Sequence, residues 1–155
     1  MTHLIEVFIL SAVPLIEQRG AIPLGLYYNI NPILVFFISF LGSILPVPFI
    51  LLLFNKIFDW MKKYKFFAKI NNYIQNKINK NSAKIEKYEE IGLITFIAIP
   101  LPTTGVWTGT VVASFLKLNL KKSMFCAAAG AAISAFILTL GLTVFKGVFS
   151  AVFGS

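Results

Sequence analysis

Two stretches without a charged residue limit how this chain can fold. Residues 32–55 and residues 124–145 contain no Asp, Glu, Lys or Arg. As α-helices they would extend about 36 Å and about 33 Å, which is enough to cross a hydrocarbon core of about 30 Å. Pro46 and Pro48 lie inside the first stretch, where they should kink the helix. The sequence therefore predicts two transmembrane helices.

The composition is that of a membrane protein and argues against an enzyme. Of 155 residues, 57% are hydrophobic and 13% are charged, against roughly 25% charged in soluble chains. The single cysteine, Cys126, cannot form an intrachain disulfide. His3 is the only histidine and Arg19 the only arginine, so the chain offers no metal-ligand cluster and no nucleophile–base pair. We expect no enzyme activity, no cofactor and no metal.

Two further apolar stretches are interrupted by residues that break helices. Residues 4–30 are broken from Pro14 to Gly20, and residues 91–117 are broken from Pro100 to Gly105. Broken backbone at membrane depth is tolerated only where protein or a water-filled cavity surrounds it. Each stretch is therefore predicted to be a re-entrant hairpin, and a single kinked span in each place is the alternative.

The lysines favour the re-entrant arrangement. Residues 56–90 hold nine lysines and four acidic residues. If residues 91–117 enter and return, Lys117, Lys121 and Lys122 join these lysines and only Lys146 lies opposite. The positive-inside rule then places the basic segment in the cytoplasm and, with the first hairpin entering from outside, both termini outside. The predicted location is the inner (cytoplasmic) membrane of the cell, with several passes.

The basic segment between the halves is predicted to lie on the membrane. Apolar residues recur at helical spacing after Lys56, with lysines mostly between them. Such a cytoplasmic amphipathic helix binds anionic lipids, with about 1 kcal/mol from each near-surface lysine. Because the positive charge flanks apolar runs, the expected partner is the lipid bilayer and not nucleic acid.

The halves of the chain show the same order of elements, a broken hairpin followed by one span. Asn31 and Gly42 are eleven residues apart, as are Asn119 and Gly130. An inverted repeat with broken helices is typical of transporters. The predicted fold is an all-α integral membrane protein of one domain. It consists of a first repeat (residues 1–55), a basic linker (residues 56–90) and a second repeat (residues 91–155).

Glu17 and Arg19 are the only ionisable groups that this topology places well inside the bilayer. A central charge costs about 2.5–3.5 kcal/mol on insertion scales, so it indicates a substrate or proton site by default. The alternative is a salt bridge between the two that only tolerates its burial. Gly20 follows directly, and an apolar half-helix is expected to begin there.

The second break offers hydroxyls and a glycine before another half-helix. Thr103, Thr104 and Gly105 precede Val106, where that half-helix is expected to begin. A helix start presents free N–H groups and a partial positive charge. If the tips approach, these ends and Arg19 would surround an anion, phosphate above all. A neutral Glu17 beside it would let a proton travel with the substrate.

The predicted substrate- or proton-binding residues come from both breaks and from the half-helices that follow them. They are Glu17, Arg19, Gly20, Pro23, Pro100, Pro102, Thr103, Thr104, Gly105, Trp107, Thr108 and Gly109. Trp107 could line the cavity or pack against lipid or a partner, and both readings stay open. Because so little protein surrounds this polar site, we expect a homodimer or a higher homo-oligomer.

Three segments resemble the small multidrug export protein family, which is related to the DedA (VTT-domain) superfamily. They are residues 14–23 (PLIEQRGAIP), 45–49 (LPVPF) and 98–109 (AIPLPTTGVWTG). The resemblance implies two facing re-entrant hairpins in a bacterial inner membrane and a role in proton-linked drug tolerance. For DedA relatives it implies movement of polyprenyl phosphate or phospholipid.

The resemblance to DedA proteins includes one departure. Glu17 and Arg19 match the Glu-x-Arg-Gly motif of the first DedA hairpin. DedA proteins also place arginines in the second hairpin, whereas residues 91–116 here carry no charge at all. Three functions remain open: a transporter or flippase for an amphipathic anion such as polyprenyl phosphate or a phospholipid, a proton-coupled exporter of small drugs, and a non-transporting membrane-integrity or scaffold protein.

Overall fold

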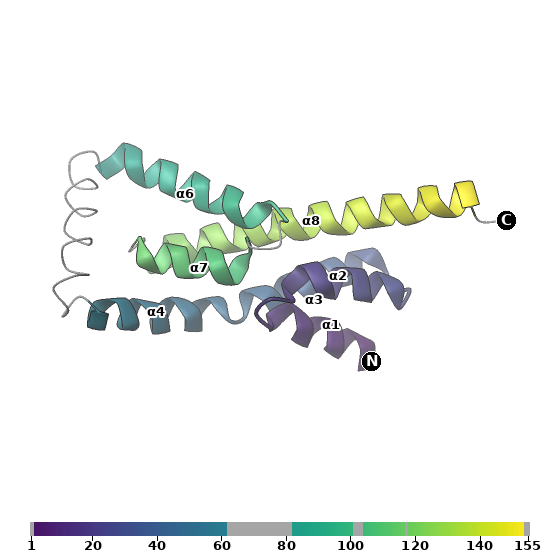
Figure 1. Cartoon of the computed structure of the whole chain (residues 1–155), viewed down its shortest axis with the longest axis horizontal. Helices are drawn as coiled ribbons and strands as arrows, with labels where there is room; N and C mark the ends of the chain where they lie inside the picture. The colour runs from purple at the N-terminus through teal and green to yellow at the C-terminus, as the bar shows by residue number, and fades with distance from the viewer. Residues whose placement is uncertain (1, 62–81, 101–103, 117, 154–155) are drawn as a thin grey trace.

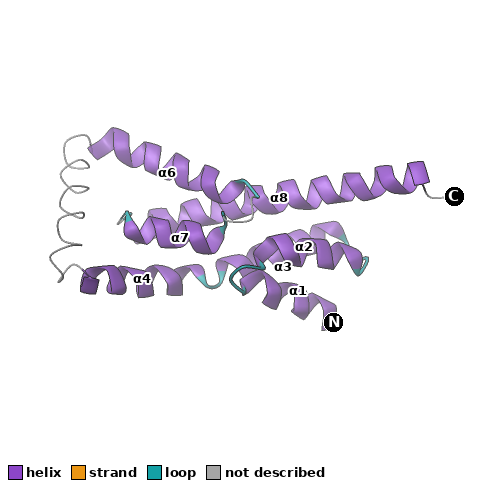
Figure 2. Cartoon of the chain, in the orientation of Figure 1, coloured by secondary structure: helices purple, strands orange, loops and turns teal. Residues whose placement is uncertain are grey.

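The computed structural model describes residues 2–61, 82–100, 104–116 and 118–153. Within these ranges every regular element is a helix, as Figure 2 shows, and the prediction of an all-α chain is confirmed. The helices are α1 (Thr2–Ala12), α2 (Glu17–Tyr27), α3 (Pro32–Ile44), α4 (Val47–Met61), α6 (Ser82–Ala98), α7 (Val106–Phe115) and α8 (Leu120–Phe153).

Two helical hairpins enter the molecule from opposite ends, as Figure 1 shows. Helices α1 and α2 form the first hairpin, and α6 and α7 form the second. Their tips lie near the middle of the long axis, where the chain passes from α1 to α2 and from α6 to α7. Helix α1 packs on α3 and α6 packs on α8, so each hairpin rests on the long helix that follows it in the chain.

Among the described residues, two segments are long and apolar enough to cross a membrane, and these candidate spans coincide with the two predicted ones. They are Pro32–Trp60 and Leu120–Val148, of 29 residues each. The first is interrupted between α3 and α4 at Leu45 and Pro46, as the prolines predicted. Because proline has no backbone N–H, the helical ladder cannot continue through Pro46; it resumes where Ile50 N–H donates to the Pro46 carbonyl at 2.9 Å.

Several helix boundaries differ from the predicted ones. Helix α6 begins at Ser82, so the end of the predicted linker belongs to the second hairpin, since no helix-breaking residue separates it from the apolar run. Helix α4 continues to Met61, which makes the start of the predicted surface helix an extension of the first span. The rest of that surface helix, residues 62–81, lies outside the described residues. Helix α8 extends the predicted span 124–145 in both directions.

The two matched glycines occupy matched positions. A Cβ on Gly42 of α3 would collide with the backbone carbonyl oxygen of Phe8 in α1. A Cβ on Gly130 of α8 would lie 2.9 Å from the carbonyl oxygen of Ile94 in α6. At each place, glycine lets a long helix touch the backbone of the first arm of its hairpin, as small residues do between membrane helices.

The two matched asparagines cap the two spanning segments. The Asn31 side chain accepts a hydrogen bond from Ile33 N–H at 2.9 Å, at the start of α3. The Asn119 side chain accepts one from Lys121 N–H at 3.1 Å, at the start of α8. Each amide oxygen satisfies an N–H group that has no partner within its helix.

Charged side chains mark the two ends of α8. Near its start, Lys122 forms a salt bridge of 3.0 Å with Glu90 of α6. Toward its end, Lys146 Nζ donates to Asn29 Oδ1 at 2.8 Å, beyond the end of α2. The two lysines are 24 positions apart, which corresponds to about 36 Å of helix and exceeds the thickness of the hydrocarbon core.

Large apolar side chains are exposed along both candidate spans. A soluble protein seldom leaves so much contiguous apolar surface in water, whereas lipid tails solvate it well. This surface, together with the length of the two segments, favours a membrane protein. Its most exposed members include Ile33, Phe37, Leu41, Phe49 and Leu52 on α3 and α4, and Phe125, Phe136, Leu140 and Phe145 on α8.

Candidate functional site

The carboxylate of Glu17, at the tip of the first hairpin, is held by the start of the second half-helix. Its Oε1 accepts a hydrogen bond of 2.9 Å from Trp107 N–H, and its Oε2 accepts one of 3.3 Å from Val106 N–H. The first N–H groups of a helix have no partner within it and carry a partial positive charge, which a carboxylate complements. Glu17 is 7% exposed, so this contact between the hairpins is buried.

The backbone at the first tip is strained. Leu15 and Glu17 have φ angles of 78° and 48°, in the left-handed region that residues with a side chain seldom adopt. Each such residue costs about 1–3 kcal/mol and persists only where the surroundings fix it. The two hydrogen bonds from α7 provide that constraint at Glu17. Helix α2 begins at Glu17, three residues before the start predicted at Gly20.

Gly105 makes the approach of the two tips possible. A Cβ on this residue would lie 2.8 Å from the Cδ atom of Glu17 and 2.9 Å from its Oε1 atom. The φ angle of Gly105 is 166°, extended backbone that any residue can adopt. Space for the carboxylate, and not conformational freedom, therefore requires glycine here.

Arg19 reaches the other side of the same tip. Its Nη2 donates a hydrogen bond of 3.0 Å to Thr104 Oγ1, and that hydroxyl donates to the Ile99 carbonyl at 2.6 Å. Among the described residues, the buried Nε of Arg19 has no hydrogen-bond partner. The guanidinium therefore joins the first hairpin to the second and keeps an open donor at their meeting point. Each of Glu17 and Arg19 thus binds the second hairpin, and no ion pair joins these two described side chains.

Two further hydrogen bonds near the tips are formed by the side chains of Trp107 and Gln18. The Trp107 Nε1–H donates to the Ala12 carbonyl at 3.1 Å, so this ring ties α7 to the end of α1. The buried Gln18 donates from Nε2 to Ser43 Oγ at 2.5 Å and so links α2 to α3. Gln18 and Ser43 were not among the predicted site residues. The only signal in the sequence was a polar side chain within each apolar run.

The other predicted site residues that the structure describes form no recorded contact with Glu17 or Arg19. Gly20, Pro23 and Thr108 are exposed. Gly109 is buried against the first arm of its own hairpin, where a Cβ would lie 2.6 Å from Ile97 Cδ1. Pro100 follows α6 at the second tip and forms no contact with Glu17 or Arg19 that the structure records. Pro102 and Thr103 lie outside the described residues.

The meeting point is therefore an oxyanion site that the protein fills with its own carboxylate. Its donors are the Val106 and Trp107 N–H groups, and the Arg19 guanidinium lies at the same tip. Within the described ranges, no group of three or more His, Cys, Asp or Glu side chains could hold a metal ion. The arrangement holds an anionic group, the Glu17 carboxylate, on two backbone N–H groups.

Comparison with protein families gives a match. The family model described as "Putative small multi-drug export protein" matches residues 17–137, a range that begins at Glu17 and includes both tips. No curated protein matches the chain, and no solved structure matches it. Because the family model covers more than three quarters of the residues, the chain belongs to the small multi-drug export protein family.

Proposed function

We propose that this protein is a transporter of the inner membrane, in which two re-entrant hairpins enter from opposite leaflets as an inverted repeat. The correspondence of the halves supports the repeat. The same number of positions separates Asn31 from Asn119, Gly42 from Gly130, and the start of α3 from the start of α8. Since α1 and α6 run in opposite directions along the molecule in Figure 1, the hairpins would open to opposite sides of a bilayer.

This topology predicts which residues share a compartment. Single cysteines are placed at exposed positions in a Cys126→Ala background, and intact cells are treated with a membrane-impermeant maleimide. We expect Ser150→Cys to react in intact cells, and Lys56→Cys and Lys121→Cys to react only after permeabilisation, because the second hairpin returns to the side it left. Labelling of Lys121→Cys but not Lys56→Cys in intact cells would mean that residues 91–117 cross the membrane.

The substrate that fits the site best is an amphipathic anion, such as a polyprenyl phosphate or a phospholipid. One observation carries this proposal: the start of α7 already holds an oxyanion, the Glu17 carboxylate. A substrate phosphate would take over the Val106 and Trp107 donors when Glu17 withdraws, and Arg19 Nε would offer a further donor. In this proposal Arg19 is the one arginine that binds the phosphate, whereas DedA proteins, to which the chain's motifs are similar, place arginines in both hairpins.

Headgroup accessibility in liposomes tests the proposal. The purified protein is reconstituted with a trace of headgroup-labelled phosphatidylglycerol, and quenching from outside reports movement between leaflets. We expect Arg19→Ala to slow this movement about tenfold or more, because one lost charge-assisted hydrogen bond is worth about 1.5–3 kcal/mol. Arg19→Lys should retain part of the rate, and the control Lys56→Ala should match the wild type. Wild-type liposomes no faster than empty ones would contradict the proposal and favour a scaffold.

A second function, proton-coupled export of small drugs, is favoured by the description of the family. Glu17 is a buried acidic side chain within the region that the family model matches, and a buried carboxylate can exchange a proton for a cationic drug. Liposomes loaded with a cationic dye distinguish the two functions. Efflux driven by an imposed pH gradient, and lost in Glu17→Gln, would favour drug export over lipid movement.

A further inference from the structure

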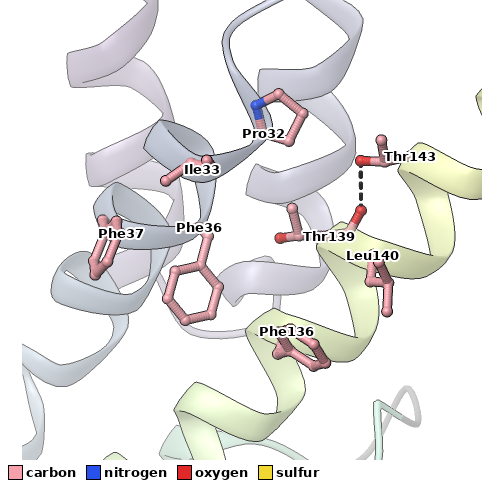
Figure 3. A pocket seen from close by; sticks show the side chains of 8 residues that line it. All are labelled: Pro32, Ile33, Phe36, Phe37, Phe136, Thr139, Leu140 and Thr143. Carbon is pink, nitrogen blue, oxygen red and sulfur yellow. Dashed lines mark hydrogen bonds between the residues drawn. The ribbon is translucent and has the colours of Figure 1, made fainter.

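An apolar groove runs between α3 and α8, away from the hairpin tips. Its volume is about 290 Å³, and Figure 3 shows the lining side chains on the two helices that border it. The Thr143 hydroxyl donates to the Thr139 carbonyl at 2.6 Å, so it is turned back to its own helix and not into the groove. The lining side chains are Pro32, Ile33, Phe36 and Phe37 on α3 and Phe136, Thr139, Leu140 and Thr143 on α8.

Two cavities lined by Lys146 lie next to this groove. A cavity of about 210 Å³ shares Pro32 and Thr143 with the groove and is also lined by Asn29 and Lys146. A further cavity of about 440 Å³ shares Asn29 and Lys146 with it. This space, the groove with its neighbouring cavities, thus combines apolar walls between α3 and α8 with the positive charge of Lys146.

The ammonium group of Lys146 has capacity for another ligand. It donates to Asn29 Oδ1 at 2.8 Å and to the Leu26 carbonyl at 3.3 Å. A lysine ammonium has three N–H donors, so these two contacts leave one. Both acceptors are uncharged, and no ion pair in the described part of the chain neutralises Lys146.

The spacing along α8 matches the depth of one lipid leaflet. At 1.5 Å per residue, the groove extends from about 5 Å below Lys146, at Thr143, to about 15 Å below it, at Phe136. Half of a hydrocarbon core is about 15 Å thick. When Lys146 lies at the level of the headgroups, the groove therefore lies at the level of the acyl chains in that leaflet.

We propose that this space binds one phospholipid with an anionic headgroup, its phosphate on Lys146 and one acyl chain between α3 and α8. Asn29 orients the ammonium toward the headgroup, and the aromatic side chains of α3 and α8 contact the chain. This site is separate from the oxyanion site at the hairpin tips, and it does not depend on transport. It would select lipids by charge, which distinguishes it from the general solvation of an apolar surface.

A structural role for Lys146 makes a different prediction. A lysine that only caps the last carbonyl groups of α2 would stabilise that helix without any preference for lipid charge. A second copy of the chain seated in the groove would change the oligomeric state, not the amount of bound lipid. Lipid binding, headgroup preference and oligomeric state together therefore separate the three cases.

Native mass spectrometry of the full chain in detergent tests the proposal. Phosphatidylglycerol or phosphatidylcholine is added, and the fraction of protein carrying one lipid is measured. We expect phosphatidylglycerol to bind about tenfold more tightly than phosphatidylcholine, and Lys146→Gln to remove that preference, because the charge-assisted contact is lost. Lys146→Arg should keep the preference. Lys121→Gln, which removes an equally exposed charge from the other end of α8, should leave it unchanged.

A second variant tests the apolar end. Leu140→Trp fills the groove from an exposed position, so it should weaken binding of both lipids without unfolding the protein. Equal binding of the two lipids by the wild type, or an unchanged preference in Lys146→Gln, would overturn the proposal. So would a Leu140→Trp protein that loses a dimer and retains its lipid.

Discussion

Replacing Glu17 by alanine is expected to cost the folded protein about 3 kcal/mol or more. The variant loses two charge-assisted hydrogen bonds and leaves the Val106 and Trp107 N–H groups buried without a partner, at about 1–3 kcal/mol for each unsatisfied group. It also leaves Arg19 without the nearby negative charge. We expect a large fall in the unfolding midpoint of the protein in detergent. The midpoint of Glu17→Gln should lie between those of the wild type and Glu17→Ala, because its amide oxygen still accepts one hydrogen bond.

Glu6→Ala is the matched control for this change. Glu6 is an acidic residue on α1 whose side chain is 41% exposed and hydrogen-bonded to His3 at 3.2 Å. Exposed pairs of this kind contribute little, so its removal should change the free energy of unfolding by less than about 0.5–1 kcal/mol. Equal effects of Glu17→Ala and Glu6→Ala would show that the contact between the tips does not stabilise the fold.

Gly105→Ala is expected to be nearly as damaging, although it adds only a methyl group. The new Cβ would occupy the place of the Glu17 carboxylate, which must withdraw from the start of α7. The two substitutions break the same contact, so the double variant Glu17→Ala/Gly105→Ala should be little less stable than either single one. A double-mutant cycle in detergent measures this coupling.

Gly141→Ala controls for the effect of alanine itself. Gly141 lies within α8, and a Cβ there would meet nothing within 4 Å. Alanine is the better helix former by roughly 0.5–1 kcal/mol, so this variant should be unchanged or slightly more stable. Effects of Glu17→Ala and Gly105→Ala that simply add would mean that the glycine and the carboxylate act independently.

Patterns along the chain were sufficient to predict the helices and the place of the interruptions. The absence of charge from residues 32–55 and 124–145 predicted two spans, because burying an unpaired charge in lipid is costly. Prolines predicted the break before α4, because they lack a donor. The extension of α6 back to Ser82 was not predicted, since charged residues in this segment looked like part of the linker.

The sequence singled out several residues that meet at the hairpin tips, but not the contacts between them. Rarity of charge singled out Glu17 and Arg19, and hydroxyls before a half-helix singled out Thr104 and Gly105. That Glu17 would itself occupy the start of α7 depends on how two segments almost ninety positions apart meet, and spacing along one chain carries no such information. Spacing alone also placed Gly109 in the predicted site, whereas in the structure Gly109 packs α7 against Ile97 of α6.

The interruption at Leu45 and Pro46 makes the two long segments mechanically unequal. Helix α8 is an unbroken rod of 34 residues, whereas the segment formed by α3 and α4 lacks a backbone hydrogen bond at its middle and can flex there at low cost. The flexible point lies two residues from Ser43, whose hydroxyl is tied to Gln18 beside Glu17. The break in the first segment is therefore linked, through Ser43 and Gln18, to the hairpin tip that carries Glu17. Bending at this point would act first on the N-terminal half of the molecule.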